Sequence, residues 1–284
     1  MDVITKEVKS NGQLIRIHGF QTGRLAIKQS AMHSKKTGVW PTLKSFRDKT
    51  FADWLPVWCW AIEHPEGVFL IDTGLSSVVN QKHYFRKIDI ISRYYFEKQM
   101  KFDIAQADEI DQQLKKVKLD SKAVSKVILT HLHIDHVGGL PYFTNVPVLV
   151  NEREWQSKDG AFPGLFPDKF TPEIVTLSEQ FQVFQKAHYI TQRRDLLMVE
   201  TTGHTTGHTS VILKVDEGLL FFAGDLAYTQ SRLQQQQFST TIKSHKQSII
   251  TCQKVKEMAQ KEKVIFLPSH DHQSGNRLAN LTSL

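Results

Sequence analysis

The sequence predicts a mixed α/β fold, and two patterns support that prediction. Short apolar runs rich in β-branched and aromatic residues alternate with segments whose apolar residues recur at helical spacing. Several of the apolar runs end directly in histidine or aspartate. A chain of 284 residues with 40% hydrophobic content can bury a large core, and no long linker or obvious repeat divides it. We therefore expect a single domain over residues 1–284.

The first half of the chain predicts a strand pair, a helix and a further strand. Residues 14–20 and 54–62 have strand-like composition, and residues 68–71 return from a Pro-Glu-Gly turn as a hairpin partner. Residues 106–118 are expected to be helical, because apolar residues recur there at i, i+4 and i+7. This helix would lead the chain to a buried strand at residues 127–130.

The second half repeats the alternation. Residues 196–199 are strand-like, and residues 209–215 and 219–223 form a predicted hairpin around an Asp-Glu-Gly turn. A helix is expected over residues 246–260, before a last strand at 264–268. Periodicity alone therefore indicates an α/β chain without fixing its layers.

Four candidate metal ligands lie within six residues after the strand at 127–130. They are His131, His133, Asp135 and His136. Because side chains two apart point the same way in extended chain, His131 and His133 could bind one ion together. The chain must turn between Asp135 and His136 if both are to face a second ion. The glycines at 138–139 would supply loose backbone for leaving that turn and starting a helix.

Three later segments place further candidate ligands at the ends of strands. A Gly/Thr-rich turn carries His204 and His208, an apolar strand ends in Asp225, and the last strand ends in a Ser-His pair that contains His270. One histidine of the turn could add a third nitrogen to the first ion, and a carboxylate could bridge two cations. Imidazole and carboxylate ligands favour Zn²⁺, with Mn²⁺, Fe²⁺ and Co²⁺ as alternatives.

The set of motifs resembles the metallo-β-lactamase superfamily. A strand-Asp-Thr-Gly turn at Asp72, the His-x-His-x-Asp-His loop, Gly-His-Thr, strand-Gly-Asp and strand-Ser-His occur in the order of that family. The resemblance implies an αββα sandwich with two divalent metal ions, with zinc expected. It also implies that Asp72 supports the site and that His208 is a structural neighbour. By the same likeness, one metal would be held by His131, His133 and His204, the other by Asp135, His136 and His270, and Asp225 would bridge them.

Within the superfamily, Tyr228 indicates which branch this chain resembles. It stands three residues after Asp225, which is similar to the N-acyl homoserine lactone lactonases, where a tyrosine at this offset contacts the lactone carbonyl. The resemblance implies a quorum-quenching hydrolase that opens the ring of an N-acyl homoserine lactone. Tyr228 would stabilise the oxyanion, and Asp135 would carry a proton to the leaving alkoxide. Ile134 departs from the aromatic residue common inside the histidine motif, which leaves the preferred acyl length open.

Other functions fit the sequence less well. Thioester hydrolases of the glyoxalase II type share the seven ligands, but they carry a C-terminal extension for which little sequence remains after His270. The β-lactamases proper lack the bridging aspartate, and neither Cys59 nor Cys252 lies in a motif. A phosphodiesterase or nuclease stays open because the chain is basic. The complete ligand set argues against a non-catalytic binding protein on the same scaffold.

The composition limits which partners and which cellular compartment we expect for this protein. Lys and Arg number 36 against 29 Asp and Glu, a net charge of +7, but the basic residues are scattered and not interleaved with aromatics. We therefore expect no nucleic-acid partner. No stretch approaches the ~20 apolar residues of a membrane span, so no membrane partner is expected. Two separated cysteines and an N-terminus without an apolar core lead us to expect a cytoplasmic protein without disulfides. Whether it forms a homodimer stays open.

An acyl substrate would need an apolar groove. The candidates are Trp54, Trp58 and Trp60, the aromatic-rich stretch at 84–96, and the Pro/Gly-rich loop at 162–167. Core packing or a dimer contact is the alternative for each aromatic residue. The loop is the best candidate, because binding residues concentrate on loops that a rigid scaffold holds.

Overall fold

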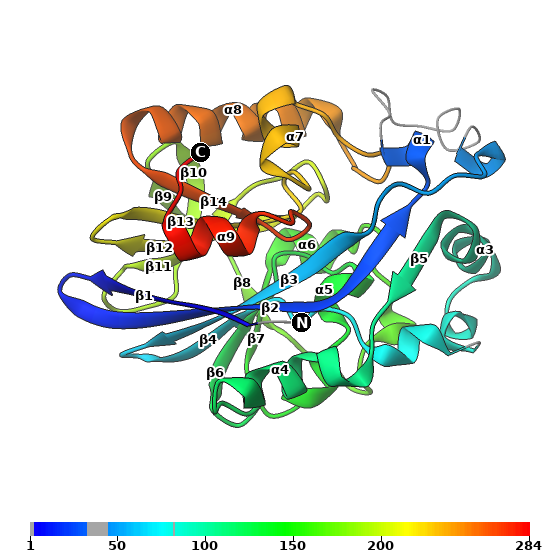
Figure 1. Cartoon of the computed structure of the whole chain (residues 1–284), viewed down its shortest axis with the longest axis horizontal. Coiled ribbons are helices and arrows are strands. Elements are labelled where there is room, and N and C mark those ends of the chain that lie inside the picture. Colours follow the sequence, from blue (N-terminus) through cyan, green and yellow to red (C-terminus); the bar gives the residue numbers. More distant parts are fainter. Residues whose placement is uncertain (1–2, 33–44, 82) are drawn as a thin grey trace.

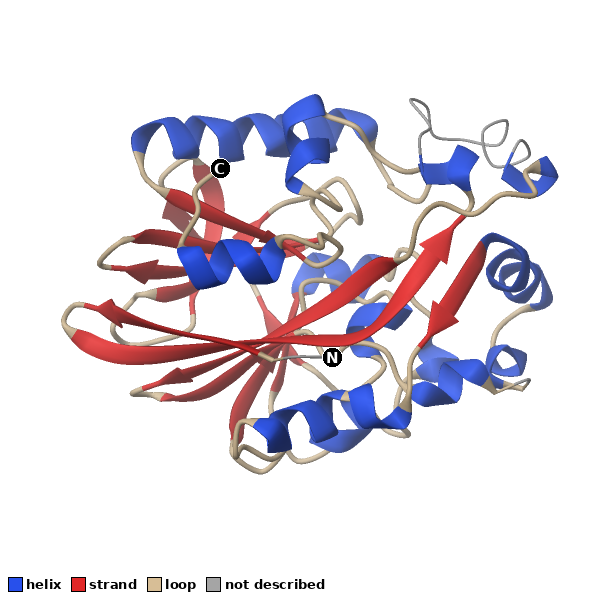
Figure 2. Ribbon diagram, in the orientation of Figure 1, coloured by secondary structure: helices blue, strands red, loops and turns tan. Residues whose placement is uncertain are grey.

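The computed structural model describes residues 3–32, 45–81 and 83–284. In this part of the chain, two β-sheets face each other and helices cover their outer faces (Figures 1 and 2). The αββα sandwich expected from the resemblance is therefore confirmed. No helix among these residues is long and apolar enough to cross a bilayer.

The first sheet has eight strands within the described ranges, in the order β1-β2-β3-β4-β6-β7-β8, with β5 paired to β2. Pairs from β1 to β4 are antiparallel, whereas β4, β6, β7 and β8 run parallel to one another. The strands are β1 (Ile4–Ser10), β2 (Gln13–Ile27), β3 (Leu55–His64), β4 (Gly67–Ile71), β5 (Met100–Asp103), β6 (Val124–Ile128), β7 (Val148–Asn151) and β8 (Glu173–Val175).

The second sheet has six strands over the same described residues, in the order β14-β13-β12-β11-β10-β9. Only β13 and β14 are a parallel pair among the pairs of this sheet. The strands are β9 (Glu179–Phe181), β10 (Phe184–Tyr189), β11 (Leu196–Glu200), β12 (Thr209–Val215), β13 (Gly218–Gly224) and β14 (Val264–Pro268).

The helices and 3-10 turns lie outside the sheets and in the loops at their edges. They are α1 (Gln29–Met32), η1 (Ser77–Asn80), η2 (Tyr84–Lys87), α3 (Ile90–Gln99), η3 (Gln106–Asp108), α4 (Ile110–Lys116), α5 (Ile134–Val137), η4 (Leu140–Phe143), α6 (Glu152–Ser157), η5 (Pro163–Leu165), α7 (Gln230–Gln235), α8 (His245–Lys261) and α9 (Ser274–Asn280).

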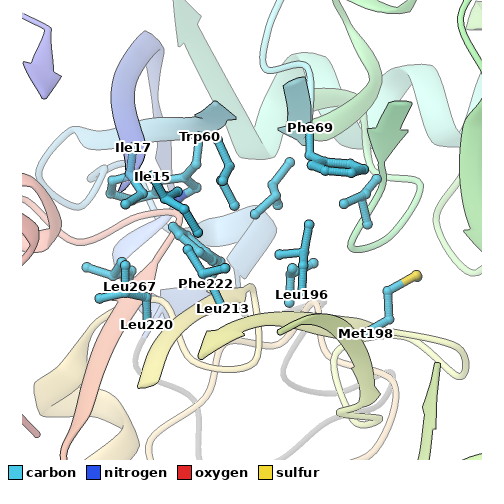
Figure 3. Packing of buried hydrophobic residues seen from close by; sticks show 14 of the residues in the cluster. Ile15, Ile17, Trp60, Phe69, Leu196, Met198, Leu213, Leu220, Phe222 and Leu267 are labelled. Carbon is cyan, nitrogen blue, oxygen red and sulfur yellow. The ribbon is translucent and has the colours of Figure 1, made fainter. Parts of the chain in front are cut away.

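The main core lies between the sheets and consists of their inward-facing apolar side chains. Figure 3 shows Ile15, Ile17 and Trp60 of the first sheet opposite Leu220 and Phe222 of the second. This layer is continuous across the sandwich. It fixes how the two sheets sit on each other, and therefore how loops from one sheet meet loops from the other.

Strand β3 shows how alternation distributes aromatic residues. Trp58 and Trp60 point into the core between the sheets, where their rings stack 5.3 Å apart. Cys59 and Ala61 point to the other face, against the layer that contains α4. The two tryptophans are therefore core residues and not part of a substrate groove, because successive side chains of a strand face opposite sides. Trp54, before the strand, lies under the Arg24 guanidinium.

Amphipathic helices cover the outer faces. Helix α8 packs Cys252, Val255 and Met258 on the second sheet, close to the expected boundaries. The helix expected at 106–118 is shorter, because Glu109 interrupts it in an extended conformation and accepts a hydrogen bond from the Ser77 backbone N–H at 2.6 Å.

Candidate metal centre

The loop after β6 turns earlier than the sequence pattern predicts. His133 keeps an extended backbone, and a single helical turn, α5, begins at Ile134. This turn brings Asp135 and His136 to the same side as the preceding histidines. Gly138 and Gly139 are not loose: both have ordinary helical dihedrals.

The two glycines are needed for close packing. A Cβ on Gly138 would lie 2.6 Å from the carbonyl oxygen of Gly74, and a Cβ on Gly139 would lie 2.5 Å from that of Thr73. The ligand loop therefore rests directly on the backbone of the turn after β4. Glycine at these positions fixes the loop in place and does not free it.

All seven sequence-predicted ligands come together at the edge of the sandwich where β6, β13 and β14 end. They form two groups, and in each group the candidate donor atoms lie within 4.8 Å of one another. One group is His131, His133 and His204, and the other is Asp135, His136, Asp225 and His270.

Asp225, a member of the second group, lies between the histidines of the two groups and presents one carboxylate oxygen to each set. Its Oδ2 is 3.4 Å from His204 Nε2 and 4.0 Å from His131 Nε2. Its Oδ1 is 3.3 Å from His136 Nε2 and 3.2 Å from His270 Nε2. A carboxylate with this placement can contribute one oxygen to each of two cations.

The donor atoms fit metal ions on chemical grounds. The Nε2 atoms of His131 and His136 and Oδ1 of Asp225 are buried without a hydrogen-bond partner among the described residues. Nε2 of His204 and Nδ1 of His133 lie only 2.9 Å apart and converge on the same space. Since buried polar atoms normally find partners, this convergence is what a cation site requires.

A second set of contacts orients the rings. Asp72 accepts a hydrogen bond from His136 Nδ1 at 2.8 Å and two from Thr130, through its backbone N–H at 2.8 Å and its hydroxyl at 2.9 Å. Nδ1 of His270 donates to the Pro56 carbonyl at 2.8 Å. Both histidines therefore direct Nε2 toward Asp225, a common arrangement for metal-binding imidazoles.

His208 has the position of a structural neighbour. Its Nε2 accepts the backbone N–H of Asp225 at 3.0 Å, and its Nδ1 lies 3.2 Å from the Thr201 carbonyl. Burial lowers the pKa of His208 to about 3, so the ring is neutral and can accept that bond. It holds the backbone of the aspartate that lies between the two groups.

Burial and charge divide the histidines of the site. Burial and the neighbouring imidazoles lower the pKa of His131 and His204 well below the ordinary value, so both rings are neutral at pH 7. Burial also acts on His136 and His270, but the carboxylates around them outweigh it and raise their pKa. The same negative charges would attract cations to these positions.

Tyr228 lies beside the centre, as the sequence suggested. Its ring is 5.0 Å from that of His270, and its hydroxyl is 3.0 Å from Thr241 Oγ1. Burial and the nearby Asp225 raise the pKa of the phenol, so the hydroxyl keeps its proton. It is therefore available as a hydrogen-bond donor.

An apolar cavity of about 370 Å³ opens over the centre and ends at Tyr228, Asp135, Asp225 and His270. Part of the expected aromatic stretch and one residue of the Pro/Gly-rich loop contribute to it, as does Ile134. The other lining residues are Leu25, Ile91, Ser92, Tyr95, Phe96, Met100, His133, Gly160, Phe162 and Thr241.

Two residues that the sequence analysis did not identify support the ligand loops. The backbone carbonyl of Asp159 accepts a hydrogen bond from His133 Nε2 at 3.1 Å. Glu154 accepts hydrogen bonds from two loops that carry ligands. Glu154 follows an Asn that caps a short helix after β7. That local signal predicts a helix start and says nothing of the distant loops.

Comparison with known proteins agrees with the fold and the centre. The model of the family described as the metallo-beta-lactamase superfamily matches residues 52–237. The chain belongs to the metallo-β-lactamase superfamily. The fold is thus a metal-dependent hydrolase fold, and the His/Asp groups are in keeping with divalent metal ions.

Several curated relatives of this chain are named N-acyl homoserine lactonases. An N-acyl homoserine lactonase of Bacillus thuringiensis is 27% identical over 223 residues, which span 76% of this chain and 82% of the relative. The N-acyl homoserine lactonase AttM of Azorhizobium caulinodans is 24% identical over 236 residues and covers the same shares. The resemblance stated from the motifs is confirmed by these relatives.

Solved structures share the fold over nearly the whole chain. An N-acyl homoserine lactone hydrolase with N-hexanoyl-L-homoserine bound at its catalytic metal centre superposes with a TM-score of 0.73, at 22% identity, over 95% of this chain and 96% of that one. AidC, a dizinc quorum-quenching lactonase, gives a TM-score of 0.62 at 15% identity, over 96% and 92%.

Proposed function

We propose that this protein is a dinuclear metal-dependent lactonase that opens the ring of N-acyl homoserine lactones. The observation that carries the proposal is the placement of Asp225 between two ligand groups, with Tyr228 beside them at the end of an apolar cavity. The names of the curated relatives support the same substrate class.

Two zinc ions are the proposed cofactors. When bound, such a pair supplies hydroxide near neutral pH and polarises a carbonyl oxygen. The chain would hold one ion with His131, His133 and His204 and the other with Asp135, His136 and His270, while Asp225 would bridge both.

The side chains around the cavity would position the two ends of the substrate. The apolar wall, with Phe96, Met100 and Phe162, suits an acyl tail, and the polar end suits the lactone head. Tyr228, with its proton retained, would donate a hydrogen bond to the carbonyl oxygen as negative charge develops there.

The bond changes are those of an ester hydrolysis. The oxygen of a water molecule bonds to the lactone carbonyl carbon, and the bond from that carbon to the ring oxygen breaks. The attacking water gives up a proton as its oxygen bonds to the carbon, and the ring oxygen, which leaves as an alkoxide, takes that proton up. We assign that transfer to Asp135, which faces the cavity and lies 3.3 Å from His270 Nε2. The product is an N-acyl homoserine.

The test is a proton-release assay on N-acyl homoserine lactones of several chain lengths, run beside a thioester and bis(p-nitrophenyl) phosphate. Fast lactone opening that a chelator abolishes and Zn²⁺ restores is the expected result. Turnover of only the thioester or only the phosphodiester would keep the metal centre and reject the lactonase. Absence of bound metal in the purified protein would reject the cofactor proposal.

A further inference from the structure

The short helix α6 meets both loops that supply the first ligand group. Its residue Glu154 is buried, with 1% of its surface exposed. The backbone N–H of Leu132 donates to Glu154 Oε1 at 3.1 Å. Because Leu132 stands between His131 and His133, this bond fixes the backbone from which both imidazoles project.

The other carboxylate oxygen holds the second loop. Glu154 Oε2 accepts the Thr205 hydroxyl at 2.6 Å and the Gly207 backbone N–H at 3.2 Å. Both donors follow His204 in the turn between β11 and β12. One carboxylate therefore connects a loop of the first sheet with a loop of the second.

The helix itself cannot shift away from that turn without losing further contacts. The Asn151 side-chain amide donates to the Gly207 carbonyl at 2.6 Å. A Cβ on Gly207 would lie 2.0 Å from the backbone nitrogen of Glu154, so only glycine permits this approach. Glu154 is thus presented to the two loops from a fixed base.

We propose that Glu154 is a positioning residue that keeps the 131–136 loop and the 202–208 turn at the spacing at which His131, His133 and His204 bind one metal ion. The inference rests on the proposed dinuclear site and deepens it. It assigns a selective role, because His136 and His270 of the other group are oriented separately, by Asp72 and by the Pro56 carbonyl.

A glutamine at this position cannot reproduce the three bonds. All three partners are donors, and a carboxylate offers two acceptor oxygens, whereas an amide offers one. In Glu154→Gln, the NH₂ group would face at least one buried N–H or O–H donor. The unsatisfied donor would let one loop relax away from the other while the volume of the side chain stays the same.

The experiment is a chelator titration of the purified zinc-loaded protein. Bound zinc per chain is measured by mass spectrometry after desalting, for wild type, Glu154→Gln and Glu152→Gln. Glu152 is the matched control, because it lies on the same helix and accepts its hydrogen bonds from Thr176 and Gln156, which belong to neither ligand loop. We expect Glu154→Gln to release one of its two ions at ~10–100-fold lower chelator activity, with the second ion retained as in wild type.

The outcomes separate this inference from the proposed function. Equal release curves for all three proteins, or simultaneous early loss of both ions in Glu154→Gln, would overturn the role of Glu154. A wild type that binds no zinc, or only one ion, would instead overturn the dinuclear site itself. Far-UV circular dichroism and the melting temperatures of the metal-free proteins check that the variants fold.

A second variant keeps the proposal testable if Glu154→Gln does not fold. Thr205→Val removes one donor to the carboxylate and keeps the glutamate, so the same ion should be weakened to a smaller extent. In the double variant the two effects should be less than additive, because both changes remove the same contact. Full additivity would contradict the proposed connection.

Discussion

The Tyr228 hydroxyl is held by Thr241 at the edge of the ligand groups, and its role can be isolated by removing one atom. Tyr228→Phe keeps the ring beside His270 and deletes the donor. We expect kcat for lactone opening to fall about 10²-fold, the effect of removing one oxyanion donor. Metal content measured on the same sample should not change. Loss of metal, or an unchanged kcat, would show that the tyrosine has another role.

Asp72 occupies a left-handed backbone conformation, with φ of 58°. Asparagine tolerates that conformation, so Asp72→Asn changes the carboxylate alone. Without the negative acceptor for its Nδ1 proton, His136 should be less well oriented and less basic, and zinc affinity should fall about 10–100-fold. Competition against a chromogenic chelator measures this. Wild-type affinity would mean that Asp72 serves only the turn after β4.

For single residues, the sequence identified metal-ligand candidates that are close together in the chain. It did not identify residues whose hydrogen-bond partners are distant in the chain. The loop from His131 to His136 could be read as a metal motif because its donors are adjacent in the chain. Glu154 could not be recognised, since its three donors come from loops that only the packing of two sheets brings to it. The metal assignments themselves stay predictions until an ion is measured.

Helix α3 and Phe162, the residue before the turn η5, form a wall of the apolar cavity, where Phe162 packs edge-on against Phe96 with ring centres 5.2 Å apart. Phe162→Ala should widen the cavity. Short acyl chains would lose contact, and kcat/KM should fall about fourfold for each methylene left without a neighbour. Longer chains should be less affected. The control is Phe170→Ala, which removes a ring that packs on Trp155.

The comparison of rates across acyl lengths decides the outcome. A uniform loss for all lengths, or an equal change in both variants, would place the acyl chain elsewhere. The sequence pointed to the 162–167 loop and the whole 84–96 stretch, of which only part lines the cavity, and it could not exclude Trp54, Trp58 and Trp60. Only the pairing of β3 determines that these two rings face the opposite sheet.

At the end of the sandwich away from the ligand groups, a buried polar cluster joins the two sheets. Asp195, just before β11, accepts hydrogen bonds from Ser10 at 2.9 Å and Thr191 at 2.7 Å and pairs with His64 at 3.1 Å. Its side chain is fully buried. Burial alone would raise the pKa of Asp195, but the bonds from His64, Thr191 and Ser10 outweigh it and lower the pKa.

A lowered carboxyl pKa stabilises the folded chain at any pH above the unfolded value of about 3.9, and the contribution is lost as the pH falls below it. Asp195→Asn should therefore cost about 3 kcal/mol of unfolding free energy at pH 7. It should also flatten the acid dependence of stability. Urea titrations at pH 7 and below pH 4 measure both. If the unfolding free energy of variant and wild type fell equally as the pH is lowered, the lowered pKa assigned to Asp195 would be contradicted.

The whole molecule was predictable in class and not in detail. Apolar runs identified most of the strands, but strand order and the pairing of β5 with β2 depend on contacts between distant segments. Glu109 shortened a helix because its carboxylate bonds to another loop. A single domain over residues 1–284, a cytoplasmic location and the question of a homodimer stay as the sequence left them.

Each ligand group draws on both sheets: His204 and Asp225 belong to the second, and the 131–136 loop to the first. A bound ion would therefore be a cross-link between the two sheets that a chelator can remove. Since ions bind the folded chain, mass action would add roughly 4 kcal/mol at a free concentration 1,000 times Kd. Stripping the ions should lower the melting temperature, and zinc should restore it. The stability of the contact between the two sheets would thus depend on the concentration of free metal ions around the protein.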